Sequence, residues 1–222
     1  MPPMEHAHGP GRSMLSALEG LARLREGNRR FVSGIPSRDA FTSRARRSEL
    51  VAGQAPFATI LGCSDSRVPV EIVFDQDLGD LFVIRVAGNI VASSLIGSVE
   101  FAAERFGTRL VVVLGHSQCG AVLATLEELR RPTKNHSPNL RSIVDRIRPA
   151  VEELLATDSG HDPDALMQRA VRANVRASAN HLRHGSEVLE QLIQSHGLLV
   201  VGAQYSLETG AVDFFDGVPD AG

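Results

Sequence analysis

The chain has 222 residues, of which 43% are hydrophobic and 22% are charged, as is ordinary for a globular protein with a buried core. Its net charge of −3 gives no bulk attraction for nucleic acid or for an anionic membrane surface. No apolar run approaches ~18 residues and the first residues are polar, so we expect no membrane span and no signal peptide. With only two cysteines there is no disulfide framework, and we expect a cytoplasmic protein without nucleic-acid or membrane partners.

The predicted elements begin with an N-terminal helical arm. Residues 1–13, rich in Pro, His and Gly, predict a flexible tail, and we expect residues 14–222 to form a single domain. Leucines at helical spacing predict an amphipathic helix over 14–34. The polar stretch 35–55 predicts a loop with a short helix, so the arm spans 14–55.

The next segment, 56–131, predicts an α/β core. Short apolar runs rich in β-branched residues are typical of buried parallel strands. Four such runs occur, at 57–61, 81–86, 110–114 and, further along the chain, 198–201. Segments of helical period, 94–107 and 121–131, follow the second and third runs. This alternation predicts the α/β class, with a central, mostly parallel sheet flanked by helices.

The remaining segment, 132–222, predicts helices and C-terminal strands. Apolar residues at helical spacing indicate that most of 137–197 is helical. Residues 203–215 predict a C-terminal hairpin that turns at 208–210.

Both cysteines come directly after predicted strands. Cys63 follows the first run, and Cys119 follows the third, with His116 three residues before it. Working residues of open α/β sheets gather at the carboxyl ends of strands, so these side chains are expected to face each other. Two thiolates and an imidazole suit Zn²⁺, and three protein ligands with one exchangeable position are typical of a catalytic zinc.

Asp65 and Arg67 follow Cys63 at intervals of two residues. An extended segment would point these side chains to one side, so that Asp65 reaches the metal or its water and Arg67 holds Asp65 in a bidentate pair. Asp65 then either closes the site as a fourth ligand or accepts a hydrogen bond from water. Because two thiolates cancel the charge of Zn²⁺, we expect a weakly acidified water and activity that rises toward alkaline pH.

Plainer interpretations stay open for these residues. The two cysteines can be small buried hydrophobic residues, or they can form a disulfide between adjacent strand ends. His116 can be a hydrogen-bonded core histidine, and Asp65 with Arg67 an ordinary surface pair.

A hydrolase interpretation also stays open. Residues 115–119, Gly-His-Ser-Gln-Cys, are one residue away from a G-x-S-x-G nucleophile elbow, which would make Ser117 a nucleophile. Its histidine partner would be His181, His184 or His196, all in predicted helices, and Cys119 stands where the elbow requires glycine.

These motifs resemble those of the β-class carbonic anhydrases. Cys63-Ser64-Asp65-Ser66-Arg67 and Gly115-His116-x-x-Cys119-Gly120 carry the resemblance, which runs from about Leu18 to Phe215. It implies reversible hydration of CO₂ to bicarbonate and a proton by zinc-bound hydroxide, with one Zn²⁺ per chain. It also implies Cys63, His116 and Cys119 as zinc ligands, with Asp65 and Arg67 as the catalytic dyad.

The resemblance further implies substrate contacts and an assembly. Gln54 stands where some members have a substrate-binding glutamine, and Gly120 offers a backbone N–H near the substrate. Phe82, Ala87 and Phe101 fall where the family lines its apolar CO₂ pocket. Members are homodimers or homotetramers with the active site at the dimer interface. The alternatives are a relative that hydrolyses carbonyl sulfide or carbon disulfide, and a catalytically silent scaffold subunit.

Overall fold

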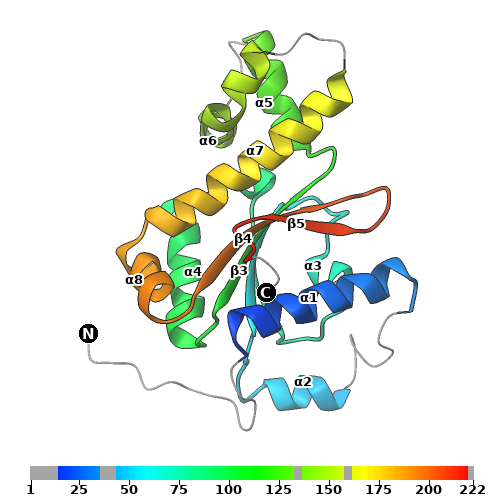
Figure 1. Cartoon of the computed structure of the whole chain (residues 1–222), viewed down its shortest axis with the longest axis vertical. Helices are drawn as coiled ribbons and strands as arrows, with labels where there is room; N and C mark the ends of the chain where they lie inside the picture. Colours follow the sequence, from blue (N-terminus) through cyan, green and yellow to red (C-terminus); the bar gives the residue numbers. More distant parts are fainter. Residues whose placement is uncertain (1–14, 36–43, 133–136, 158–161, 220–222) are drawn as a thin grey trace.

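The computed structural model of the chain describes residues 15–35, 44–132, 137–157 and 162–219 (Figure 1). The strands within them are β1 (Ala58–Gly62), β2 (Leu81–Arg85), β3 (Leu110–His116), β4 (Leu199–Tyr205) and β5 (Val212–Asp216). The helices are α1 (Ala17–Val32), α2 (Arg44–Leu50), α3 (Val70–Val73), α4 (Ser93–Arg105), α5 (Gly120–Arg130), α6 (Pro138–Ala156), α7 (Pro163–His184) and α8 (Glu187–Ser195), with a 3₁₀ turn, η1 (Ala87–Asn89). None of these helices combines the length and apolar character that a membrane crossing needs.

The predicted sheet is confirmed in class and in direction. Its strand order is β2-β1-β3-β4-β5, in which the first four strands are parallel and β5 is antiparallel to β4. The predicted hairpin is therefore present. β3 and β4 extend beyond their apolar runs, since they stay paired as far as His116 and Tyr205. An apolar run alone underestimates the length of such a strand, because hydrogen bonding to the neighbouring strand continues past the last apolar residue.

Alternate residues of the strands pack on opposite faces of the sheet. Ile60 and Val112 belong to the core that α1 and α3 cover, whereas Leu61 and Val113 belong to the core beneath α4, α7 and α8. Because helices cover both faces of the sheet, the strand sequences are continuous apolar runs and do not alternate between apolar and polar residues.

The arm helix α1 has a defined start and a close contact with the sheet layer. Ser16 caps it by accepting a hydrogen bond from the Glu19 N–H, and the Glu19 carboxylate accepts one from the Ser16 N–H. Asn28 donates to the carbonyls of Val73 and Gly210, which ties α1 to α3 and to the hairpin turn. The helix is thereby fixed to two distant parts of the chain.

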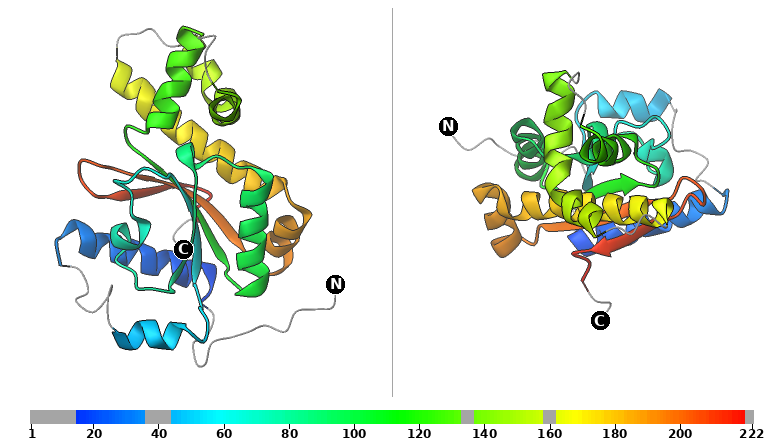
Figure 2. Two further views of the ribbon diagram at one scale, coloured as in Figure 1. Left: turned by 180° about the vertical axis from the view of Figure 1, so that it is seen from behind. Right: turned by 90° about the horizontal axis from the view of Figure 1, so that it is seen from above.

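Helices α5, α6 and the first half of α7 lie beyond one end of the sheet (Figure 2). They share a third apolar core with Cys63 and Cys119, to which Val122, Ile147 and Val171 contribute. This core places the ends of β1 and β3 against the helices. The short elements α3 and η1 are not among the sequence predictions, and the predicted tail 1–13 lies outside the described residues. The division into a tail and a single domain stays a prediction.

Candidate metal centre

Three possible metal ligands converge at the carboxyl ends of β1 and β3. Cys63 follows β1, His116 ends β3, and Cys119 is the N-cap residue of α5. All three are buried, and their ligand atoms lie within 4.8 Å of one another. Because β1 and β3 are parallel neighbours, their ends bring the two motifs together as the sequence predicts.

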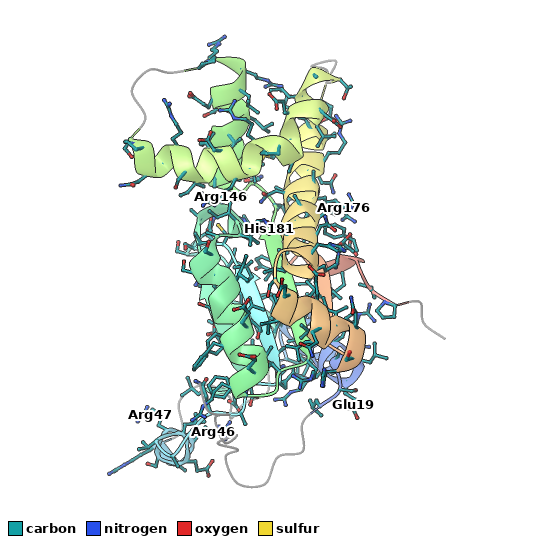
Figure 3. The ribbon with its side chains drawn as sticks, turned by 90° about the vertical axis from the view of Figure 1, so that its left-hand side faces the viewer. Glu19, Arg46, Arg47, Arg146, Arg176 and His181 are labelled. Carbon is teal, nitrogen blue, oxygen red and sulfur yellow. The ribbon has the colours of Figure 1, made fainter. Side chains whose placement is uncertain are left out.

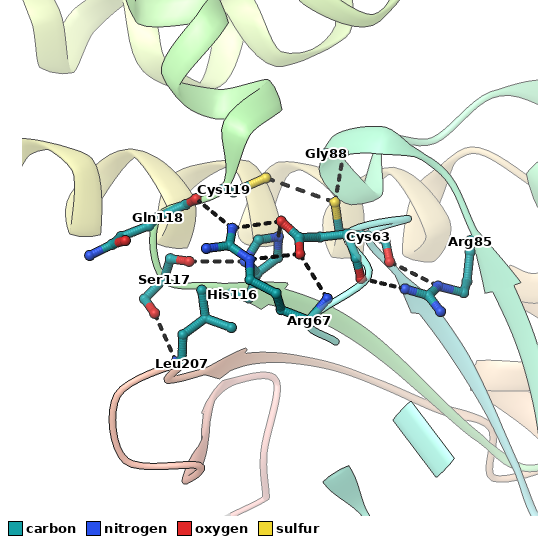
Figure 4. A network of polar contacts seen from close by, with 10 residues as sticks. Cys63, Arg67, Arg85, Gly88, His116, Ser117, Gln118, Cys119 and Leu207 are labelled. Atoms are coloured by element: carbon teal, nitrogen blue, oxygen red, sulfur yellow. Dashed lines mark hydrogen bonds and ion pairs between the residues drawn. The ribbon is translucent and has the colours of Figure 1, made fainter. Parts of the chain in front are cut away.

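The His116 ring is held in the orientation that a metal ligand needs. Its Nδ1 lies 2.9 Å from the Ser117 carbonyl oxygen (Figure 4). A carbonyl oxygen only accepts, so Nδ1 carries the proton and Nε2 presents its lone pair. That Nε2 atom is buried and has no hydrogen-bond partner. A buried nitrogen lone pair without a partner is costly unless something binds it, and a metal ion would do so.

The two thiols are also suited to a divalent cation. Their sulfur atoms are 4.0 Å apart, and both cysteines are free. The pKa of Cys63 is lowered mainly by its hydrogen bond with Cys119, and further by the contacts of its sulfur with His116 and with the Gly88 N–H. The pKa of Cys119 is raised by its hydrogen bond to Cys63, by burial and by the charge of the Cys63 thiolate. Without a metal, the two thiols together therefore favour a single thiolate. A dication such as Zn²⁺ would stabilise both as thiolates.

Asp65 and Arg67 form the predicted bidentate pair beside this cluster. Arg67 Nε and one terminal nitrogen donate to the two Asp65 carboxylate oxygens at 2.9 and 2.7 Å. The Arg67 guanidinium holds the pKa of Asp65 well below its usual range. Asp65 Oδ2 is 3.8 Å from His116 Nε2, so the ionised carboxylate borders the ligand cluster while Arg67 retains it.

Arg85 is a residue of the site that the sequence predictions did not include. Its Nε donates to the Cys63 carbonyl at 3.0 Å, and a terminal nitrogen donates to the Asp65 carbonyl at 2.6 Å. Arg85 ends β2 opposite Gly62 in the parallel register, so strand order puts it beside the ligand loop. A charged residue ending a buried apolar run is the signal that could have found it.

Of the five predicted substrate contacts, two lie beside the ligand cluster, Gly120 and Ala87, and three lie elsewhere, Phe82, Phe101 and Gln54. Gly120 is the exposed first residue of α5, and Ala87 begins η1, whose Gly88 contacts Cys63. Phe82 packs against Phe101, with ring centroids 6.2 Å apart, on the sheet-face core and not on the core that contains Cys63. Gln54 is exposed in the segment before β1.

The disulfide and the hydrolase interpretations gain no support. Cys63 and Cys119 are not joined by a disulfide. The Ser117 hydroxyl accepts a hydrogen bond from the Leu207 N–H at 2.9 Å, which ties the C-terminal hairpin to the loop after β3. His181, labelled in Figure 3, and His184 are both exposed on α7. Across the described ranges no hydrogen bond joins the Ser117 hydroxyl to a histidine ring, so the geometry of a triad is missing.

Comparison with known proteins decides the family. A family model described as carbonic anhydrase matches residues 58–212. Carbonic anhydrase 2 of Mycobacterium tuberculosis is 40% identical over 200 residues, which cover 90% of this chain and 93% of that protein. The chain belongs to the β-class carbonic anhydrase family. The matched range includes every residue of the ligand cluster and the Asp65–Arg67 pair.

Further relatives agree with this family assignment. Carbonic anhydrase of Pseudomonas aeruginosa is 34% identical and covers 81% of this chain and 83% of its own. The crystal structure of the β-carbonic anhydrase CafA of Aspergillus fumigatus has a TM-score of 0.69 at 27% identity, covering 78% of this chain and 81% of that one. One of two β-carbonic anhydrases of Sordaria macrospora, described as tetrameric, has a TM-score of 0.66 at 26% identity, covering 76% and 85%.

Proposed function

We propose that this protein catalyses the reversible hydration of CO₂ to bicarbonate and a proton, with one Zn²⁺ per chain held by Cys63, His116 and Cys119. The observation that carries the proposal is the convergence of these ligand atoms within 4.8 Å, with the His116 Nε2 lone pair unpartnered. When bound, zinc would supply a Lewis acid that lowers the pKa of water and so makes it a nucleophile, here toward alkaline pH because two thiolates offset the metal charge.

The chain's own residues then have separate roles. The Asp65 carboxylate, which Arg67 keeps ionised, accepts a hydrogen bond from the attacking water and orients it toward the carbon of CO₂. Arg67 stays paired and fixes the direction of that carboxylate, while Arg85 holds the backbone on either side of it. The Gly120 N–H and Ala87 border the space where the substrate binds.

We further propose that the chain works as a homodimer or homotetramer in the cytoplasm. Gln54 and Phe101 are exposed in the single chain, Phe101 to 46%, which suits residues that complete the substrate pocket across an interface with a second copy. The tetrameric relatives of Sordaria macrospora support the larger assembly. Free thiols that serve as ligands favour a reducing compartment.

Stopped-flow CO₂ hydration from about pH 6.5 to about pH 9, with zinc measured on the same sample, tests the proposal. We expect about one zinc per chain and turnover that rises toward alkaline pH. Bound zinc without CO₂ hydration, but with hydrolysis of carbonyl sulfide or carbon disulfide, would replace the proposal with the hydrolase alternative. No zinc and no turnover would favour the scaffold subunit.

A further inference from the structure

A backbone N–H is aimed at one of the ligand sulfur atoms. The Gly88 N–H donates to Cys63 Sγ at 3.3 Å from η1, the turn that covers this side of the cluster (Figure 4). Gly88 has φ 72° and ψ 18°, and Asn89 has φ 42°, so two consecutive residues lie in the left-handed region. A turn of this shape needs outside contacts to persist, because only glycine adopts it freely.

Asn174 supplies such a contact from a distant part of the chain. Its Nδ2 donates to the Gly88 carbonyl oxygen at 2.8 Å, and the side chain is only 2% exposed on α7. The Gly88 carbonyl and the Gly88 N–H flank the same Cα atom. Together with the Asn89 N–H, which donates to the Val86 carbonyl at 3.1 Å, this hydrogen bond holds the peptide group between Gly88 and Asn89 and so limits the rotations about the Gly88 Cα atom that set the direction of its N–H.

Two further helices close around the same turn. A Cβ atom at Gly88 would lie 2.8 Å from Ile147 Cδ1 of α6 and 3.0 Å from the Ala121 Cβ of α5, so both helices press on the turn. Arg146 of α6 donates from Nε to the Val91 carbonyl at 3.2 Å, just beyond η1. The helices that lie beyond the sheet thus confine η1, and Asn174 sets its orientation.

We propose that Asn174 is a positioning residue of the metal centre, which keeps the Gly88 N–H on Cys63 Sγ by holding the Gly88 carbonyl. The inference rests on the proposed function in one respect, that the cluster binds a metal. An N–H donated to a thiolate fixes the position of the sulfur and withdraws part of its charge. Without it, Cys63 is free to rotate away from His116 and Cys119, and the sulfur becomes more electron-rich.

Metal binding by Asn174→Leu and Asn174→Ala tests this role. Leu keeps the volume without a donor, and Ala provides a second variant if the Leu variant does not fold. We expect zinc affinity, measured by competition with a chromophoric chelator, to fall about tenfold in both, in the range found for residues that orient metal ligands. In the cobalt-substituted protein the sulfur-to-metal charge-transfer band should move to longer wavelength.

Asn28→Ala is the matched control. Asn28 is also a buried asparagine that donates to backbone carbonyls, those of Val73 and Gly210, but it lies on α1 away from η1. We expect it to lower stability while the zinc affinity stays within about twofold and the cobalt band does not move. A purely structural role of Asn174 would give the same result for both positions.

Two outcomes would overturn the proposal. One is wild-type zinc affinity and an unmoved cobalt band in both Asn174 variants. The other is a change in Asn28→Ala as large as in those variants. These readouts are independent of CO₂ hydration, so a wild-type protein that binds zinc but hydrates no CO₂ refutes the proposed function and leaves the role of Asn174 open to the same measurement.

Discussion

At the scale of single residues, the role proposed for the Asp65–Arg67 pair in the chemistry can be tested apart from metal binding by the ligand cluster. Asp65 is two residues from a ligand, yet its carboxylate oxygens are occupied by Arg67 at 2.7 and 2.9 Å. The converging ligand atoms come from Cys63, His116 and Cys119. A change at Asp65 should therefore affect turnover more than metal content.

Asp65→Ala should lower CO₂ hydration by about 100-fold or more, because it removes the group that accepts the hydrogen bond of the attacking water. Zinc content should stay at about one per chain. Asp145→Ala is the control, since Asp145 also pairs with an arginine, Arg148, on the exposed face of α6. Unchanged CO₂ hydration in Asp65→Ala would show that the mechanism proposed for this carboxylate is wrong.

The same pair predicts a pH dependence of stability. Because the folded-state pKa of Asp65 lies below its unfolded value, the pair stabilises the fold fully above the unfolded pKa of about 3.9 and loses this contribution as pH falls toward the folded pKa. Arg67→Gln should therefore destabilise by a constant amount from about pH 5 to 8 and by less below about pH 4. Urea unfolding of both proteins measures this; a difference that varies between pH 5 and 8 contradicts it.

At the scale of elements, the docking of α1 depends on one missing side chain. A Cβ at Gly27 would overlap the Phe74 carbonyl oxygen, because the helix backbone lies directly on the end of α3. Gly97 is likewise inside a helix, α4, but a Cβ there would meet no atom within 4 Å. The two glycines therefore have opposite structural roles in spite of similar positions.

The two alanine substitutions should change stability in opposite directions. Gly27→Ala should lower the free energy of unfolding by about 1–3 kcal/mol, because the backbone contact cannot accommodate a methyl group. Gly97→Ala should raise it by up to about 1 kcal/mol, through helix propensity alone. Urea unfolding at neutral pH compares them, and equal effects at the two positions would contradict the close packing of α1.

At the scale of the whole molecule, the single chain leaves an aromatic surface uncovered beside the edge strand β2. Phe82, Phe101 and Phe106 pack together there, with ring centroids 5.6–6.2 Å apart. Phe101 remains 46% exposed. An edge strand beside exposed aromatic rings is a typical place for contact between copies of a chain.

Phe101→Glu should convert the proposed dimer or tetramer into a smaller species, because a charge would be buried without a partner in the interface. Light scattering coupled to gel filtration measures the mass. Leu140→Glu is the matched control, as Leu140 is 55% exposed on α6 and should tolerate the charge with no change of mass. An unchanged mass for Phe101→Glu would place the interface elsewhere.

The sequence by itself determined the class of the fold and pointed to the three candidate metal ligands that the structure brings together. Apolar runs with β-branched residues mark buried strands, and Cys63 and His116-x-x-Cys119 stand at fixed intervals after two of them. The Asp65–Arg67 pair is equally local, because a spacing of two residues in an extended segment decides it. Such features depend on neighbours in the chain and are visible in one dimension.

Only the tertiary structure decided what surrounds those ligands. Arg85 reaches the ligand loop because β2 pairs with β1, and Asn174 reaches Gly88 across 86 residues because α7 packs behind η1. The local sequence marks Arg85 only as a charged end to an apolar run and does not mark Asn174 at all, and it shows the partner of neither residue. Periodicity encodes which face of an element is buried, whereas strand order and helix packing, which involve the whole chain, decide what that face meets.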